Sequence, residues 1–221
     1  MNYTFNPSVV LLNWVGLAHG VEVTLILSFT SFIGALLFGL IAALGRLSSH
    51  RAVNMIAGAY IEFVRNTPLV VQLVWIYYCL PILIGINMPG MQAAIIGLSV
   101  GESGNVAEII RGGIRAIPKG QIEAAKAVGF SPATTMMRVI LPQAFRLMIP
   151  PLLNSFVALL KATALVAIIA VPDLMFVAQR MSAETFRPIE LLTAAAIIYF
   201  LIAYPIVLCV RRIERRAWSH L

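Results

Sequence analysis

The chain has 221 residues, of which 60% are hydrophobic and 11% are charged. Because soluble domains carry roughly 25% charged residues, this composition excludes an ordinary soluble enzyme. The net charge of +7 does not indicate a nucleic-acid partner, since Lys and Arg in so apolar a chain are expected in short loops that orient its helices. We predict an all-α integral membrane protein surrounded by membrane lipid.

Apolar segments recur along the chain, and each reaches the roughly 20 residues that a helix needs to cross the hydrocarbon core. The predicted spans cover about residues 21–45, 52–84, 91–110, 147–172 and 191–210. Gly34, Gly39 and Gly45 in the first span are typical of places where two membrane helices approach closely. We therefore predict five transmembrane helices in a single domain, residues 1–221.

The second predicted span is interrupted at Asn66, Thr67 and Pro68. Thr before Pro is a helix-start signal, so we expect Thr67 as the N-cap and Pro68 as the first residue of a new helix. A helix broken at membrane depth is tolerated only where it faces protein or lines a cavity. The interruption is therefore a candidate part of a pathway, although Arg65 beside it has the alternative of extending to the membrane interface.

The fourth predicted span begins at Pro150-Pro151 and carries Lys161 in its middle. An ionisable group inside a span is costly, and it usually marks a pathway or a partner. A purely structural ion pair with Glu62, Glu102 or Glu108 is the alternative, and the sequence leaves it open. A polar connection from Asp173 to Pro188 is expected after this span.

A long polar segment, about residues 114–146, separates the third and fourth spans. Glu123, Ala124 and Ala125 lie in an Ala-rich stretch that favours a helix, and Gly129 suits the C-terminal cap of that helix. An ordinary amphipathic loop helix is one interpretation. We favour a helix that uses the surface of a partner protein, because the segment has few large apolar residues of its own.

The cations are distributed unevenly between the two sides of the predicted membrane domain. Most of them lie in residues 46–51, 111–146 and 211–216, whereas the opposite side holds Arg180 and Arg187. The cation-rich side is expected to be cytoplasmic. Five spans then place the N-terminus in the periplasm, and the C-terminus and the 114–146 segment in the cytoplasm.

Motifs of catalytic sites are weak in this sequence. No P-loop pattern occurs, and no cluster of His and Cys indicates a metal site. The runs at residues 97–101 and 101–104 resemble hydrolase motifs around Ser99 and Ser103. The first motif requires a strand-to-helix turn, which a predicted helix excludes, and the second requires a His base that no predicted span supplies. We interpret these small residues as helix-packing positions and predict no enzyme active site.

The spacing within the polar segment matches a known pattern. Glu123-Ala124-Ala125 is followed after three residues by Gly129, and Val139 then precedes Leu141-Pro142. This run resembles the EAA signature of ABC-importer permeases, with Val139 where the signature has Ile. Further likeness to the polar amino acid (histidine/glutamate/arginine/opine) permeases lies in residues 65–72, 108–114, 118–121 and 154–165. The resemblance covers about residues 20–216 and implies the type I importer (MetI-like) permease fold.

The resemblance also implies a function and a set of partners. The chain would be the permease subunit of an importer in the bacterial inner membrane that moves a polar amino acid at the expense of ATP. Its implied partners are ABC ATPase subunits that hold ATP and Mg²⁺, a second permease subunit (identical or a sister), and a periplasmic solute-binding protein. The chain itself would hold no cofactor. The implied ATPase-coupling residues are Glu123, Ala124, Ala125 and Gly129.

The substrate pathway implied by the resemblance lies near mid-membrane. Its residues are Arg65, Thr67, Gln72, Asn154, Ser155, Lys161, Ala162 and Thr163. Ser155 and Ala162 stand where many relatives carry Glu and Asp, so we expect a neutral half-pocket, suited to a neutral or acidic amino acid or to a non-binding partner in a heterodimer. Residues 171–188 instead resemble the histidine/opine branch, and both interpretations stay open.

A stand-alone channel or secondary transporter for small polar solutes is the rival hypothesis. It predicts function without an ATPase subunit. Inverted repeats would favour it, and none is evident in the sequence.

Overall fold

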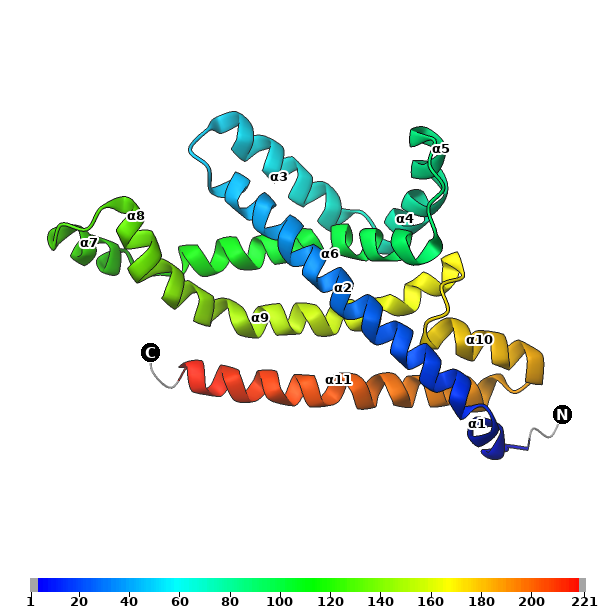
Figure 1. Ribbon diagram of the computed structural model, residues 1–221. Coiled ribbons are helices and arrows are strands. Elements are labelled where there is room, and N and C mark those ends of the chain that lie inside the picture. Colours follow the sequence, from blue (N-terminus) through cyan, green and yellow to red (C-terminus); the bar gives the residue numbers. More distant parts are fainter. Residues whose placement is uncertain (1–3, 219–221) are drawn as a thin grey trace.

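The computed structural model describes residues 4–218, with side chains described up to residue 213, and this range contains helices and no strand. Helices α6 (Gly90–Arg115), α9 (Leu141–Ala162) and α11 (Pro188–Trp218) run side by side. Helix α2 (Trp14–Leu47) crosses them obliquely and packs most extensively on α6 (Figure 1). The short helix α1 (Ser8–Leu12) precedes α2, and α10 (Leu174–Thr185) covers one end of α2 and α11.

The membrane-spanning elements agree with the predicted number of spans. Four helical stretches are long and apolar enough to cross a membrane, and they are Trp14–Leu47, Gly90–Arg115, Pro132–Ile169 and Pro188–Ile213. The number is five when the bent pair Arg51–Asn66 and Leu69–Ile84, whose halves meet at 103°, is counted as one span. The first half is α3 (Arg51–Asn66), and the second consists of α4 (Leu69–Val74), the π-helix Trp75–Cys79 and α5 (Leu80–Ile84).

The break in the second span lies where it was predicted, but its capping differs. Thr67 ends α3 instead of beginning α4, because its hydroxyl donates to the carbonyl of Phe63 at 2.7 Å, one turn back. Such local bonds from Thr to the preceding turn compete with N-capping. Pro68 then occupies the N-cap position of α4, and no side chain caps that helix. The predicted N-cap role of Thr67 was therefore wrong.

Two further boundaries differ from the prediction. Pro150 and Pro151 lie inside α9, which already begins at Leu141, since packing between α6 and α11 keeps a helix continuous across prolines. The expected connection from Asp173 to Pro188 contains α10, whose N-cap Asp173 accepts a hydrogen bond from the Phe176 amide at 2.9 Å. Asp before an apolar run is an N-cap signal.

The α2–α6 contact depends on glycines, as the first span predicted. A Cβ added at Gly39 would lie 2.6 Å from Val106 Cγ1, and one at Gly34 would lie 2.3 Å from Ser99 Oγ. Gly45 approaches α3 in the same way, with Ala57 Cβ at 3.0 Å. These small residues let the helix backbones approach closely, which membrane helices use for van der Waals packing.

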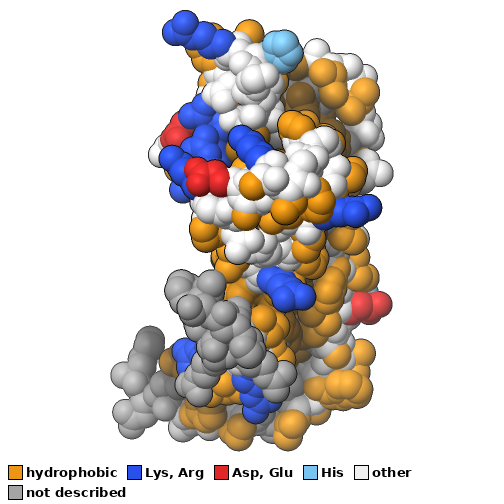
Figure 2. Space-filling view, turned by 90° about the vertical axis from the view of Figure 1, so that its left-hand side faces the viewer, with side chains coloured by type: hydrophobic (Ala, Val, Ile, Leu, Met, Phe, Trp, Pro, Cys, Tyr) orange, Lys and Arg blue, Asp and Glu red, His pale blue; other side chains and the backbone are white. Residues whose placement is uncertain are grey.

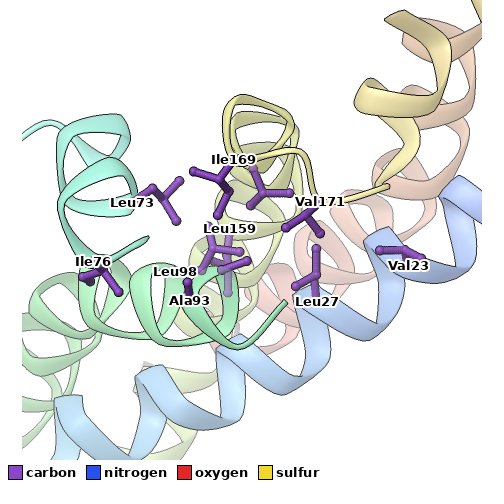
Figure 3. Packing of buried hydrophobic residues seen from close by; sticks show 11 residues of the cluster. Val23, Leu27, Leu73, Ile76, Ala93, Leu98, Leu159, Ile169 and Val171 are labelled. Atoms are coloured by element: carbon purple, nitrogen blue, oxygen red, sulfur yellow. The ribbon is translucent and has the colours of Figure 1, made fainter. Parts of the chain in front are cut away.

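A buried apolar cluster fixes the bent span against the rest of the fold. Leu73 and Ile76 from the second half of that span meet Ala93 and Leu98 of α6 (Figure 3). Other members come from α2, from α9, from the end of the 3-10 helix Thr163–Ile169 and from the turn after it, and they are Val23, Leu27, Leu159, Ile169 and Val171. The break at Thr67 is therefore held in a defined place beside α6.

Candidate functional site

The polar segment between α6 and α9 is helical for most of its length. It contains α7 (Lys119–Ala127), α8 (Pro132–Thr135) and the π-helix Met136–Ile140, and α7 packs against the latter two. The segment projects from one end of the molecule (Figure 1). Ile117 and Ile140 at its two bases are buried in the cluster that includes α2, α6 and α9, so the segment is attached to the spans by apolar contacts.

Gly129 ends α7 in the way that the sequence predicted. It lies just after the cap residue Val128 and has a left-handed backbone with φ +83°. The Gly129 amide donates to the carbonyl of Lys126 at 3.0 Å, and the Phe130 amide donates to the carbonyl of Ala125 at 3.0 Å. This pair of bonds is the Schellman motif, and it fixes the direction in which the chain returns to the membrane.

The predicted coupling residues of α7 divide between two faces. Glu123 and Ala124 are exposed, whereas Ala125 is buried within the chain. Ala125 therefore seats α7 on its own subunit, and the outward surface consists of its neighbours. Val128 at the tip of that surface is 71% exposed, and it was not among the residues predicted from the sequence.

Positive charge gathers at the end of the molecule that carries α7 and α8. Figure 2 looks onto this end and shows Lys and Arg side chains grouped there. The α2–α3 turn with Arg46 and Arg51 lies at the same end, whereas α10 with Arg180 lies at the opposite end (Figure 1). Of the predicted cation-rich stretch 211–216, Arg215 and Arg216 have side chains outside the described residues. Apart from Arg65 and Lys161, which lie within spans, the described cations are thus sorted between the two ends.

The break between α3 and α4 borders a pocket of about 290 Å³, lined by Phe63, Thr67, Val71, Gln72, Trp75 and Ile76. Gln72 is buried, and its side-chain amide donates to the carbonyls of Val64 and Thr67, each at 2.9 Å. These two bonds satisfy carbonyl groups that the missing helical turn leaves open. Gln72 therefore stabilises the break, and Thr67 lines the pocket beside it.

A chain of polar side chains connects α3, α6 and α9. Arg65 on α3 donates from Nε to Asn105 Oδ1 on α6 at 3.3 Å, and Asn105 donates to Glu102 Oε2 at 3.4 Å. The other carboxyl oxygen of Glu102 accepts a hydrogen bond from Ser155 on α9. We call Arg65, Asn105, Glu102 and Ser155 the polar strip. It brings together the predicted residues Arg65 and Ser155, and it adds two that the prediction did not assign.

The remaining predicted pathway residues lie along α9 and its end. Asn154 and Lys161, seven residues apart and hence on one helix face, are both exposed. Ala162 is half-buried, and Thr163 is buried with its hydroxyl donating to the carbonyl of Leu160 at 2.8 Å. None of these four residues lines the pocket at Thr67. One subunit thus presents the predicted pathway residues in three groups: at the pocket, in the polar strip, and along α9 and its end.

Lys161 forms no ion pair among the side chains that the structure describes. The three carboxylates considered for it have other partners: Glu62 accepts from Asn66, Glu108 pairs with Arg111, and Glu102 belongs to the polar strip. The purely structural pair was therefore the wrong alternative within this subunit.

The two serines of the hydrolase-like runs serve helix packing. Ser99 donates to the carbonyl of Ser31 on α2 at 3.0 Å. Ser103 is buried and lies 2.7 Å from the hydroxyl of Tyr60 on α3. Both lie inside α6, whereas a nucleophile elbow requires a strand-to-helix turn.

These features define a helical membrane protein with a broken span, a polar strip at membrane depth and a capped helix presented at its cation-rich end. A family model described as "binding-protein-dependent transport system inner membrane component" matches residues 35–219. The chain belongs to this family of inner-membrane transport components.

Individual relatives agree with the family. The chain is 39% identical to the probable glutamine ABC transporter permease protein GlnP of Bacillus subtilis, over 89% of this chain and 91% of that protein. It is 38% identical to the L-cystine transport system permease protein TcyB of the same organism, over 92% and 87%. A chain in the crystal structure of an amino acid ABC transporter with histidines superimposes with a TM-score of 0.91 at 36% identity, covering 97% of this chain and 100% of that one. The fold is therefore that of an ABC-importer permease.

Proposed function

We propose that this chain is the permease subunit of an importer that moves a polar amino acid across the inner membrane and draws its energy from a separate ATPase. The single observation that carries the proposal is the capped helix α7, which presents Glu123, Ala124 and Val128 to a partner at the cation-rich end. Relatives named for glutamine and cystine transport support an amino acid as substrate. A solute-binding protein would deliver it, as the family description implies.

The coupling step follows from how α7 is held. A rigid-body movement of the ATPase reaches the spans only through a helix that does not bend at its ends. Gly129 and its two backbone bonds fix one end, and buried Ala125 seats the middle. Movement of a partner against Glu123 would therefore be transmitted to α6 and α9. ATP and Mg²⁺ would be bound by that partner and not by this chain.

A second permease subunit is part of the proposal. Lys161 and Asn154 are exposed on α9 within the Pro132–Ile169 span, and a charged side chain inside a span is costly unless it has a partner. A second subunit, identical or a sister, would cover this face and enclose a polar pathway. Arg65, Thr67, Gln72, Asn154, Ser155, Lys161, Ala162 and Thr163 would border it.

We assign the orientation from the sorted cations. The end that carries α7, α8 and the α2–α3 turn would face the cytoplasm, and α10 with the N-terminus would face the periplasm. The ATPase then meets α7 from the cytoplasm. Cysteine labelling at Ser49 and at Glu184, both exposed, in inside-out and right-side-out vesicles tests the assignment: only Ser49→Cys should react from the cytoplasmic side.

The proposal is tested by reconstitution. The chain is co-expressed with the genes beside it, purified, and placed in proteoliposomes with ATP inside and the binding protein outside. Uptake of an amino acid that requires both ATP and the ATPase subunit is the expected result. Uptake by the chain without an ATPase would favour a channel or secondary transporter instead, and it would overturn the proposal.

A further inference from the structure

Glu102 lies in the middle of α6, in the Gly90–Arg115 span. We propose that Glu102 is a substrate-binding residue whose carboxylate pairs with an ammonium group of the transported molecule. The inference rests on the proposed amino-acid importer and names one group of the substrate that this subunit recognises.

The partners of Glu102 leave its charge without compensation. Its hydrogen bonds come from the hydroxyl of Ser155 and the amide of Asn105, and both groups are neutral. No ion pair between described side chains includes Glu102. A carboxylate within a span is expensive unless a cation pairs with it. A cation from outside this subunit's described contacts would compensate the Glu102 carboxylate, and a transported ammonium group is such a cation.

The two carboxyl oxygens of Glu102 have different surroundings. Oε1 receives the bond from Ser155, whose side chain is buried between α6 and α9. Oε2 receives the longer bond from Asn105, which is exposed. The carboxylate is thus anchored by one oxygen in the helix seam, while the other lies toward the open side. The Glu102 side chain is thus held in place through Oε1, while Oε2 remains able to contact a ligand.

Asn105 also ties this carboxylate to a cation. It accepts from Arg65 Nε at 3.3 Å while it donates to Glu102 at 3.4 Å. A guanidinium and a carboxylate are therefore held on either side of one amide. An amino acid carries an ammonium and a carboxylate on one carbon, and this pair of charges is complementary to it. Arg65 would face the substrate carboxylate, and Glu102 the ammonium.

The position of Glu102 changes the expectation for Ser155. The neutral half-pocket was predicted because residues 155 and 162 carry no charge. The structure places a carboxyl group from α6 against the Ser155 hydroxyl. The carboxyl group that α9 lacks at Ser155 is thus supplied beside it by Glu102 of α6.

The test measures binding directly on the purified permease–ATPase complex, by calorimetry with glutamine, cystine, lysine and N-acetylglutamine, together with ATP-driven uptake. Glu102→Gln keeps the shape and an acceptor for Ser155 but removes the charge. Because a charge-assisted hydrogen bond is lost, affinity is expected to fall by about tenfold or more. Glu102→Asp should retain part of the affinity. Glu22→Gln, an exposed carboxylate near the start of α2, is the matched control and should bind normally.

The pattern across ligands identifies the ammonium group. If the α-ammonium pairs with Glu102, all three amino acids weaken in Glu102→Gln, and the wild-type preference for glutamine over N-acetylglutamine disappears. If a side-chain ammonium pairs with it, lysine alone weakens. Each result supports the proposal.

Two results distinguish failure of the Glu102 proposal from failure of the proposed function. Unchanged affinity in Glu102→Gln, with thermal stability lowered to the same extent as in Ser155→Ala, would show that Glu102 only joins α6 to α9 and would overturn the inference. Absence of ATP-dependent amino-acid uptake by the wild-type complex would contradict the proposed function itself.

Discussion

The Phe130 amide donates to the carbonyl of Ala125 at 3.0 Å and so closes the end of α7 across Gly129. Ala125 is buried, while Glu123 two residues earlier is exposed. One turn of α7 therefore packs against its own subunit through Ala125 and exposes Glu123 on the opposite side. A backbone bond and a small buried side chain thus fix the end and the middle of α7.

Substitution of Gly129 should uncouple ATP hydrolysis from transport. An L-residue in the left-handed region costs about 1–2 kcal/mol, and open space around Gly129 means that this strain is the main effect of Gly129→Ala. We expect uptake to fall several-fold while membrane insertion and ATPase activity persist. The measurement is the ratio of amino acid transported to ATP hydrolysed in proteoliposomes.

Gly85 provides a matched control. It has φ +67°, also has nothing within 4 Å of an added Cβ, and follows α5, far from α7. Gly85→Ala therefore imposes a similar backbone strain elsewhere. An equal loss of coupling in both variants would mean that general destabilisation, and not α7, is responsible.

Val128 should contribute to the partner contact. It is an apolar side chain 71% exposed at the tip of α7, and burial of apolar surface is the main favourable contribution to most protein–protein association. We expect Val128→Asp to reduce the amount of ATPase that co-purifies by more than half. Val128→Ile keeps the apolar surface and should retain the ATPase. Normal recovery with Val128→Asp would place the contact on another part of the segment.

Gly39 should be essential for the α2–α6 packing. A Cβ there would lie 2.6 Å from Val106 Cγ1 and 3.0 Å from the Ser103 carbonyl, and overpacking of this kind costs about 1–3 kcal/mol. We expect Gly39→Ala to lower the midpoint of thermal unfolding in detergent. The double variant Gly39→Ala/Val106→Ala should recover part of the loss. Gly112→Ala adds the same methyl where nothing lies within 4 Å, and a comparable loss there would refute the packing argument.

Asp173 should make stability depend on pH. It lies between the last two spans, and burial raises its pKa above the ordinary value of 3.8, against the opposing effects of the Phe176 amide and the Tyr199 hydroxyl. A raised folded-state pKa means that the protonated form is favoured by folding, so stability is full below 3.8 and declines as the pH rises through the folded-state pKa. The midpoint of thermal unfolding should decline in the wild type as the pH rises from 3.8 through the folded-state pKa of Asp173. In Asp173→Asn the midpoint should change less over the same pH interval. A wild-type unfolding midpoint that rises with pH would contradict this predicted decrease.

The spans and the α7 cap could be predicted from sequence because both are local properties. Length and hydropathy are enough to identify a membrane helix, and a left-handed cap strongly favours glycine at the position of Gly129. Boundaries were less certain where local signals compete. Thr67 had the sequence of an N-cap, yet its hydroxyl bonds backward to Phe63. Pro150 indicated a helix start, yet α9 continues through it because neighbouring helices support it.

The polar strip required the tertiary structure. Glu102 and Ser155 are 53 residues apart, and no periodicity in the chain relates them. Their contact exists because α6 and α9 pack side by side through a shared apolar cluster. The sequence by itself determined the class, the spans and the α7 cap, since each depends on residues close together in the chain. Only the packing of α6 against α9 decided that a carboxyl group lies against Ser155, because the side chains that meet across two helices depend on the rotation and the depth of each helix.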